Sequence, residues 1–514
     1  MYTEITVRIR PEEAVNDEIL RREVARGLKM GVQRVKHVDI IRRSVDARQR
    51  TVLLNLLVGV HIDRIEEREK VFVPAYRDVS GGPSVIIVGA GPGGLFAALR
   101  LIERGYCPVI LERGKCVDER KGDLGRLYRT GVVDEDSNFG FGEGGAGTFS
   151  DGKLYTRSKK RGDVQRILEI LVHFGADKTI LTDAHPHIGT DKLPRVIVNI
   201  RKAIEGFGGR VCFNTRVTDL LIRDGHVRGV VAGGKEFLAE HVILATGHSA
   251  RDVYRMLHAR NVYMETKEFA VGLRVEHAQF DIDCMQYHNR TGRGEYLPAA
   301  EYSFVTNVDQ RGVYSFCMCP GGVVVPAATG PGQQVVNGMS ASGRNTPWAN
   351  SAMVTSVGEA ELMYMKYQGL FAGMEFQEAL EKRAWEEGGC KLHAPAQVLT
   401  DFLNGKSSRR LPRSSYKPGV TNSPVHEWFP ALLYERLQKG IRYFGQRAKG
   451  FVTEQALVLG VETRTSAPLR IPRERERFVH VEVGGLYPCG EGAGYAGGIV
   501  SAAMDGEKCA EHVL

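Results

Sequence analysis

The sequence predicts an α/β fold built around a Rossmann-like dinucleotide-binding domain, with an α+β domain inserted into it and a small α+β domain at the N-terminus. Three observations predict this fold. A short apolar run at 84–89 leads through a glycine-rich turn into an amphipathic helix, as a buried parallel strand commonly does. Two hairpin signals, Asp224-Gly225 and Gly233-Gly234, divide residues 210–245 into three strands. A last apolar run, 485–489, again ends in a glycine-rich turn before a helix.

Changes of pattern along the chain set the expected domain boundaries. We expect an N-terminal α+β domain at 1–75, followed by a linker that contains Ser80-Gly81-Gly82-Pro83. The dinucleotide-binding domain is expected to be discontinuous, at 83–266 and 451–514. Residues 267–450 are predicted to form the inserted substrate or cap domain, since apolar stretches there alternate with long polar loops.

Apolar periodicity predicts the individual elements of these domains. In the N-terminal domain it indicates strands at 2–9, 35–41 and 51–60 and a helix at 17–29. In the dinucleotide-binding domain it indicates helices at 164–174 and 195–207. In the inserted domain it indicates strands at 269–275, 314–319 and 322–326 and a helix at 376–385.

The turn at 89–94 carries the three glycines of a G-x-G-x-x-G pattern. Gly89 permits the tight turn, Gly91 lets the backbone approach a pyrophosphate, and Gly94 lets the helix lie close to the strand. Pro92 suits the first helical turn, where its missing N–H is not needed. Glu112 ends the next predicted strand at the distance expected of an acid that binds ribose hydroxyls. These features together predict a bound dinucleotide.

Three further features favour FAD over NAD. Glu112-Arg113-Gly114 is similar to the strand end of glutathione-reductase-like FAD folds. The meander at 210–245 resembles the usual insert of that fold, and its end, Ala245-Thr246-Gly247, resembles the A-T-G motif. Gly490-Glu491 resembles the late G-D motif, with a glutamate in place of the aspartate that binds the ribityl chain. Because no second G-x-G-x-x-G follows a strand, NAD(P)H is expected only as a transient reductant or as a ligand of the inserted domain.

Longer segments resemble bacterial FAD-dependent dehydrogenases of an uncharacterised, NAD/FAD-utilising family with an N-terminal α/β extension. The matching segments include 44–48, 142–153, 187–191, 316–322, 337–340, 462–466 and 490–499. The resemblance covers nearly the whole chain. It implies FAD binding and a two-domain flavoprotein architecture, but it implies no particular substrate.

The predicted cofactor contacts come from the glycine-rich turns, the ends of the predicted strands and two loops. They are Gly89, Gly91, Pro92, Gly93, Gly94, Glu112, Arg113, Arg120, Gly145, Ala146, Gly147, Lys153, Val217, Ala245, Thr246, Gly247, Gly490, Glu491, Gly497, Gly498 and Ile499. In this fold class the last helix directs its N-terminus at the flavin, where its dipole stabilises the anionic reduced ring. Arg120 is expected at the pyrophosphate, and a solvated surface arginine is the alternative.

Four side chains are candidates for the chemistry itself. His187 is an acid/base candidate near the flavin, with packing as the alternative. Regular alternation would put Cys317 and Cys319 on one strand face, as a redox pair or as two packed apolar thiols. Arg464 is a candidate carboxylate clamp, with a structural salt bridge as the alternative.

The composition narrows the class of protein. There is no run of 18 apolar residues and no apolar signal core at the N-terminus, so we expect a cytoplasmic protein without a membrane partner. The nine scattered cysteines predict reduced thiols, and their spacing predicts no metal site. The formal net charge of +8 comes without a long basic run, so no nucleic acid is expected. The sequence therefore predicts an oxidoreductase that moves a hydride between a small-molecule substrate and FAD, with a flavin-based redox sensor or partner-binding module as the alternative; a homo-oligomer is left open.

Overall fold

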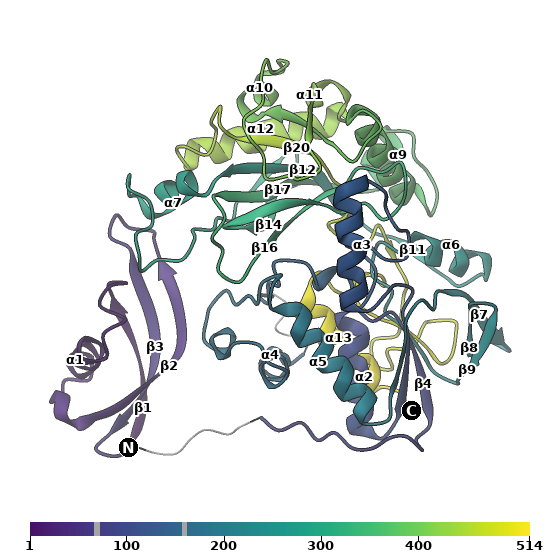
Figure 1. The fold of residues 1–514 in the computed structure, drawn as a ribbon, viewed down its shortest axis with the longest axis horizontal. Coiled ribbons are helices and arrows are strands. Elements are labelled where there is room, and N and C mark those ends of the chain that lie inside the picture. The colour runs from purple at the N-terminus through teal and green to yellow at the C-terminus, as the bar shows by residue number, and fades with distance from the viewer. Residues whose placement is uncertain (66–71, 157–161, 514) are drawn as a thin grey trace.

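A computed structural model describes residues 1–65, 72–156 and 162–513 of the chain. Three parts can be told apart in Figure 1. The N-terminal domain lies at the left, a domain with a large sheet lies at the top, and a domain with a parallel sheet lies at the lower right. No helix in the described ranges has the length and apolar character needed to cross a membrane.

The N-terminal domain is a three-stranded antiparallel sheet with one helix against it. Its elements are β1 (Tyr2–Ile9), α1 (Asp17–Gly27), β2 (Val35–Asp46) and β3 (Leu53–Ile62), and β3 is the central strand. Asn16 caps α1 by accepting hydrogen bonds from the backbone N–H groups of Glu18 and Ile19. The predicted strand at 35–41 continues to Asp46, because β2 pairs with β3 along this whole length.

The parallel sheet has the order β22-β10-β4-β5-β6, and all of its strand pairs are parallel. Its strands are β4 (Ser84–Val88), β5 (Cys107–Leu111), β6 (Arg210–Cys212), β10 (Val242–Leu244) and β22 (Leu486–Pro488). Helices α2 (Pro92–Arg104), α4 (Val164–His173), α5 (Leu193–Gly206) and α13 (Ile499–Glu511) form the layer on one face. The mixed α/β character and the parallel sheet agree with the fold class predicted from the sequence.

The other face of this sheet is covered by a three-stranded meander of β7 (Val217–Arg223), β8 (His226–Ala232) and β9 (Lys235–Leu238). Alternation along β4 divides its side chains between the layers: Val85 and Ile87 pack against the helices, and Ile86 and Val88 pack against the meander. The two predicted turns join these strands. The meander is shorter than the predicted 210–245, because the first and last of those residues belong to β6 and β10 of the parallel sheet.

The remaining large domain, from β12 to β20, is called the cap domain below. Its seven-stranded sheet has the order β13-β14-β17-β12-β20-β18-β19, and a two-stranded ribbon, β15-β16, lies beside it. These strands are β12 (Phe269–Ala278), β13 (Val305–Val308), β14 (Arg311–Cys319), β15 (Gly322–Pro326), β16 (Val336–Ser340), β17 (Trp348–Val357), β18 (Ala394–Val398), β19 (Val420–Asn422) and β20 (Leu457–Glu462). The sheet extends beyond the expected boundary at residue 450, since β20 pairs with both β12 and β18.

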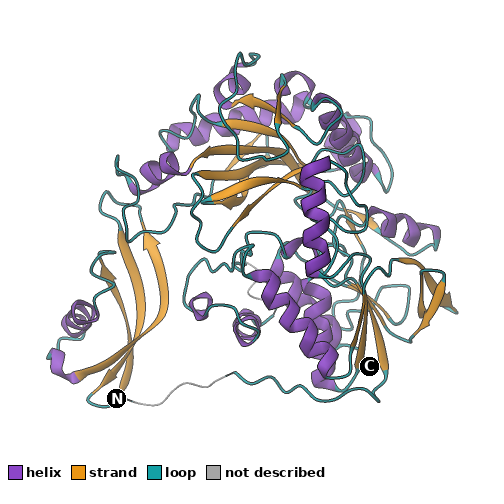
Figure 2. Cartoon of the chain, in the orientation of Figure 1, coloured by secondary structure: helices purple, strands orange, loops and turns teal. Residues whose placement is uncertain are grey.

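Helices cover the outer side of the cap sheet (Figure 2). The cap helices are α7 (Gln279–Tyr287), α8 (Glu359–Tyr364), α9 (Ala372–Glu387), α10 (Leu399–Asn404), α11 (Val425–Trp428) and α12 (Ala431–Arg447). Helices α3 (Val117–Thr130) and α6 (Arg251–Ala259), with the short pair β11 (Glu265–Thr266) and β21 (Leu469–Arg470), complete the parallel-sheet domain. The cap therefore leaves the opposite side of its sheet to face the parallel-sheet domain.

Candidate functional site

A cavity of about 280 Å³ lies where the carboxyl ends of β4, β10 and β22 meet the cap domain. Val88, Leu244 and Pro488 end these strands, and the turns that follow them line the cavity. Open parallel sheets bind ligands at this edge, at the point where the strand order reverses. The sheet order places β4 between β10 and β5, so the cavity occupies that position.

Most of the predicted cofactor contacts line this one cavity, although they come from distant parts of the chain. They are Gly89, Gly91, Pro92, Gly93, Glu112, Arg113, Gly145, Ala146, Gly147, Val217, Ala245, Thr246, Gly247, Gly490, Glu491, Gly497, Gly498 and Ile499. Two of the predicted chemical candidates also line it: Cys317 of the cap, and Arg464 just after β20.

The glycine turn has the geometry expected from its pattern. Gly89 has φ of +104°, and a Cβ at this position would lie 2.5 Å from the carbonyl oxygen of Ala245. A Cβ on Gly94 would lie 2.0 Å from the carbonyl oxygen of Gly89, so only glycine lets α2 approach the strand this closely. This geometry agrees with the tight turn expected at Gly89 and the close packing expected at Gly94, and a cofactor contact of either glycine stays a prediction. Gly94 acts by packing and does not line the cavity.

Other glycines leave bare backbone around the cavity. An added Cβ on Gly247, Gly497 or Gly498 would meet no protein atom within 4 Å, and on Gly490 the nearest atom would be 4.0 Å away. Gly498 is the N-cap of α13, and no side chain caps this helix, so its first N–H groups are offered to the cavity. The space beside these glycines suits a flat ring system that can carry negative charge, with bare backbone against the ring and a helix N-terminus beside it.

Glu112 is buried at the edge of the cavity and organises the surrounding loops. Its Oε2 accepts a hydrogen bond from the Ala90 N–H at 2.8 Å, and its Oε1 accepts from the N–H groups of Gly114 and Gly142 at 2.9 and 3.0 Å. The carboxylate therefore joins the first turn to the loop that follows α3. A ribose contact remains a prediction.

The sequence did not identify several residues at the mouth of the cavity. Asp252 forms ion pairs with both Arg113 and Arg216, at 2.9 Å in each case. The Arg113 guanidinium also stacks over the Phe141 ring, 4.2 Å from its centre. The sequence indicated only Arg113. Asp252, Arg216 and Phe141 belong to a helix and two loops that come close to Arg113 only in the folded chain.

Two predicted contacts lie elsewhere. Arg120 is fully buried and donates to three backbone carbonyls, those of Asn138, Phe139 and Glu143, at 2.8 to 3.0 Å. It therefore fixes the loop after α3 and does not line the cavity, so the expectation of a pyrophosphate contact was wrong. Burial lowers the pKa of Arg120 to about 10.

Lys153 also lies outside the cavity. Its ammonium group donates to the carbonyl oxygen of Met318 and lies 3.9 Å from Cys319 Sγ and 3.5 Å from Asp151 Oδ2. The predicted cofactor contact was therefore wrong. Lys153 instead supplies a positive charge behind the cysteine pair of β14.

The cysteine pair does not have the regular alternation that we expected. β14 has a bulge between Phe316 and Cys319, and Cys317 adopts a φ of +49°. As a result Cys317 lines the cavity, whereas Cys319 is buried beneath it. Arg274 reaches both residues, with Nη2 2.8 Å from the Cys317 carbonyl oxygen and 3.6 Å from Cys319 Sγ.

The surroundings of the two thiols favour one shared negative charge. A hydrogen bond from the Cys319 side chain, with help from Lys153 and Arg274, holds the pKa of Cys317 well below its usual value. The same hydrogen bond and burial raise the pKa of Cys319. Lys153 and Arg274 therefore favour a negative charge on the cysteine pair, with the lower pKa at Cys317.

Glu462, at the end of β20, is a second titratable group on the cavity wall. Its Oε2 lies 2.7 Å from Arg274 Nη1, and both side chains are buried. Burial raises the pKa of Glu462 to about 7, because the ion pair with Arg274 only partly offsets the loss of hydration. Glu462 belongs to the segment 462–466, which resembles the family described above. Nothing near Glu462 in the sequence indicated that Arg274, on β12, would be its partner.

Arg464 reaches the cavity, but its donors are already engaged. Its guanidinium donates to both carboxylate oxygens of Glu381, to Thr329 and to Gln333. Arg251 binds the same Glu381 carboxylate from α6 at 2.8 Å. The structure thus favours the salt-bridge alternative: Arg464 ties the cap to the parallel-sheet domain.

His187 does not lie at this cavity. Its Nε2 contacts the carbonyl oxygen of Ser342 at 3.1 Å, and the ring lines a second cavity, described below. Burial lowers its pKa. The expectation of an acid/base at the flavin is therefore wrong for His187.

Among the described residues one group has metal-ligand character: Cys489, Asp505 and Cys509. The guanidinium of Arg473 already contacts two of these three side chains, with Nη1 2.9 Å from Asp505 Oδ2 and 3.3 Å from Cys509 Sγ. The guanidinium supplies the positive charge that a metal ion would bring.

Comparison with known proteins agrees with this geometry. A family model described as "FAD-dependent protein, C-terminal domain-like" matches residues 268–465, and a model of a domain of unknown function matches residues 1–61. An uncharacterised protein of Clostridium beijerinckii is 40% identical over 515 residues, which cover 96% of each chain. Protein FixC of Escherichia coli K12 is 28% identical over 189 residues, or 37% of this chain and 42% of FixC.

Solved structures are more distant. A geranylgeranyl bacteriochlorophyll reductase-like protein from Thermoplasma acidophilum aligns over 84% of this chain and 78% of its own, with 12% identity and a TM-score of 0.34. A score of this size carries no argument about fold or function. The cofactor is nevertheless established by the family match together with the cavity: it is FAD.

Proposed function

This chain belongs to a family of FAD-dependent oxidoreductases, and from that premise we propose that it transfers a hydride between a small organic substrate and the flavin of FAD. One observation carries the proposal. In one cavity, three distant segments of the parallel-sheet domain meet the Cys317 thiol and the Glu462 carboxyl group of the cap. This meeting of segments supports, as part of the proposal, a glutathione-reductase-type FAD domain with an inserted substrate domain.

The residues around the cavity suggest how FAD would be held. The turn at 89–93 and the N-terminus of α2 would bind the pyrophosphate, and Glu112 would accept bonds from a ribose. Glu491 would bind the ribityl chain. The bare backbone at Gly497 and Gly498 would lie against the ring. When bound, FAD supplies the hydride acceptor and donor of the reaction.

Cys317 and Glu462 are the groups that we propose to move the proton. Oxidation of an alcohol or amine releases a proton from its oxygen or nitrogen as the hydride leaves its carbon. The Cys317 thiolate or the ionised Glu462 carboxylate would accept that proton at the cavity wall. Arg274 lies between the two groups and stabilises whichever one is charged.

The test is anaerobic reduction of the FAD-loaded full chain. NADH, NADPH and a panel of alcohols, amines and hydroxy acids are added in turn, and the visible absorbance of the oxidised flavin is followed. Bleaching by one of them, and recovery with a second compound, supports an oxidoreductase. A flavin that none of these donors reduces contradicts the proposal and favours the redox-sensor alternative.

A pair of cysteine variants separates the proposed proton transfer from general damage. Cys317→Ser should shift the pH profile of flavin reduction, because the group with the lowered pKa is gone. Cys390→Ser is the matched control, since Cys390 is an exposed free thiol that does not line the cavity. Identical pH profiles for the wild type and Cys317→Ser would remove Cys317 from the mechanism.

A further inference from the structure

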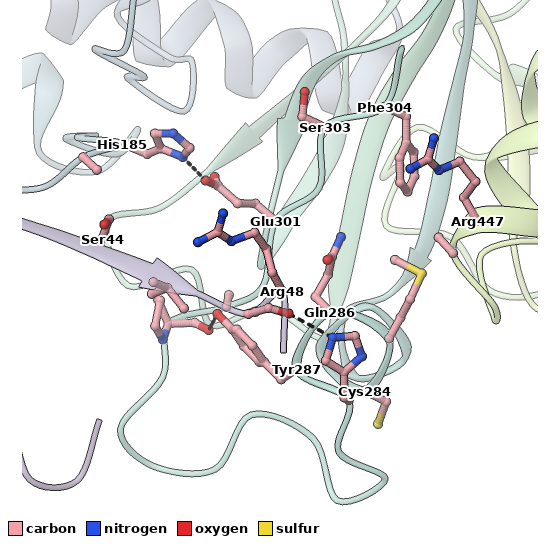
Figure 3. Close-up of a pocket in the computed structure, with 18 of the residues that line it drawn as sticks. Ser44, Arg48, His185, Cys284, Gln286, Tyr287, Glu301, Ser303, Phe304 and Arg447 are labelled. Carbon is pink, nitrogen blue, oxygen red and sulfur yellow. Dashed lines mark hydrogen bonds and ion pairs between the residues drawn. The ribbon is translucent and has the colours of Figure 1, made fainter. Parts of the chain in front are cut away.

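A second and larger cavity, of about 1430 Å³, lies where the N-terminal domain, the parallel-sheet domain and the cap meet. The end of β2 supplies one wall and residues 183–187 supply another, and their backbones pair through Arg43 and Asp183. The third wall is formed by α7, residues 298–305 and the end of α12. Figure 3 shows Arg48, His185 and Arg447 around the same space, on three different parts of the chain.

The walls of this cavity carry an excess of positive charge. The cationic residues are Arg42, Arg43, Arg48, Arg344, Arg447 and Lys449, against two acidic residues, Asp183 and Glu301. Both acids already face a cationic partner: Glu301 is hydrogen bonded to His185, and Asp183 lies in the field of Arg43. Within the described part of the chain, neither Arg42 nor Lys449 forms an ion pair, and Arg447 binds only the Tyr443 hydroxyl.

Arg344 is the feature that points most directly to a ligand. Its side chain is nine-tenths buried, yet it lines the cavity. Nη2 donates to Asp151 at 3.1 Å, while Nε is buried and has no hydrogen-bond partner in the structure. A buried donor left unmatched costs free energy, so a ligand that draws the Arg344 side chain toward the cavity would relieve that cost. The charge of Arg344 also disfavours protonation of His185 and of His187, and both histidines line the same cavity.

The rest of the wall is apolar or aromatic. Phe304, Tyr287 and Met285 line the cavity beside the cationic residues. A ligand that satisfies both parts carries anionic groups at one end and a flat or apolar body at the other. The cavity volume exceeds the roughly 300–1,000 Å³ of typical small-molecule sites, so the cavity has room for a nucleotide.

We propose that this cavity binds a nucleotide-class organic phosphate, with its phosphates at Arg344, Arg42 and His187 and its base against the Phe304 wall. Arginine suits phosphate because its planar fork gives paired, charge-assisted hydrogen bonds. The site is distinct from the cofactor cavity, with which it shares no lining residue among those described. The proposal therefore goes beyond the proposed hydride transfer and does not rest on it.

The test is calorimetric titration of the FAD-loaded full chain, from which free FAD has been removed, with ADP, pyrophosphate and adenosine as separate probes. The flavin absorbance retained on the protein verifies that the cofactor cavity stays filled, so binding reports on the second cavity. We expect ADP to bind more tightly than either fragment. Binding of pyrophosphate as tight as that of ADP overturns the nucleotide class, and adenosine as tight as ADP overturns the phosphate contacts. No heat change with millimolar ADP, or ADP binding that is matched by release of FAD from the protein, overturns the site itself.

Variants locate the binding. The double variant Arg42→Ala/Arg447→Ala should weaken ADP binding at least tenfold, because two exposed cations of the wall are lost. Arg410→Ala is the matched control, as Arg410 is exposed and lines neither cavity, and it should change the dissociation constant less than twofold. Equal affinities of the double variant and the wild type would overturn the proposal. Both variants remove exposed side chains, and unchanged thermal unfolding verifies that they fold.

Discussion

The buried carboxyl group of Glu462 gives the sharpest prediction for stability. The pKa of this group is raised from 4.5 to about 7, chiefly by burial. Between these two values the folded chain keeps the proton that the unfolded chain has lost, so the stability falls as the pH rises through that window. At 1.36 kcal/mol per pKa unit, the loss is about 3.4 kcal/mol when the pH rises from 4.5 to above 7.

Replacement by Gln removes this pH dependence, because a neutral amide does not titrate. The assay is thermal unfolding of the wild type and Glu462→Gln from pH 4.5 to 8. One kcal/mol shifts the melting temperature of a domain of this size by about 2–4 °C, so the difference between the two proteins should change by about 7–14 °C. Glu476→Gln is the control, since Glu476 is exposed. A Glu462→Gln difference that stays constant with pH would refute the reasoning.

Three other substitutions test other parts of the structure. Gly498→Val places a side chain where no protein atom lies within 4 Å, so FAD affinity should fall at least hundredfold, or about 2.7 kcal/mol, in a fluorescence titration; unchanged affinity would remove Gly498 from the cofactor site. Glu381→Gln leaves Arg251 and Arg464 buried without their carboxylate, and denaturant unfolding should show a loss of about 3–5 kcal/mol; a loss under 1 kcal/mol would contradict the role of this triad as a tie between domains. Gly122→Ala, on the exposed face of α3 with free space around its Cβ, should raise stability by up to about 1 kcal/mol in the same assay; a lowered stability would contradict the helical assignment.

Local patterns in the sequence were enough to predict the parallel sheet and its first turn. The run at 84–88 and the helix after it are defined by neighbours in the chain, and the glycines at 89 and 94 are required by contacts within this same unit. The hairpin signals placed the meander turns for the same reason. The ends of the meander were not predicted, because parallel pairing of β6 and β10 with strands far along the chain is not visible locally.

The errors at the site have one physical origin. Arg120 and Lys153 were assigned to the cofactor because they follow motifs that bind it. Their donors are instead used by backbone carbonyls, and in the case of Lys153 by one that lies 165 residues further along the chain. Likewise, the bulge at Cys317 interrupts the strand alternation from which we inferred that the side chains of Cys317 and Cys319 lie on one face. A charged side chain near a motif can satisfy any nearby acceptor, and the sequence does not show which acceptor the fold brings close.

The position of Asp151 links the second cavity to the cysteine pair of β14. One of its oxygens, Oδ2, lies 3.1 Å from Arg344 Nη2, which lines the second cavity, and 3.5 Å from Lys153 Nζ, which lies behind the cysteine pair. An anion bound at Arg344 would compete with Asp151 for that guanidinium and leave the carboxylate more fully to Lys153. A more strongly neutralised Lys153 stabilises the Cys317 thiolate less, so the pKa of Cys317 would rise. The direction of this coupling follows from the signs of the charges alone, and it requires no contact between the two ligands.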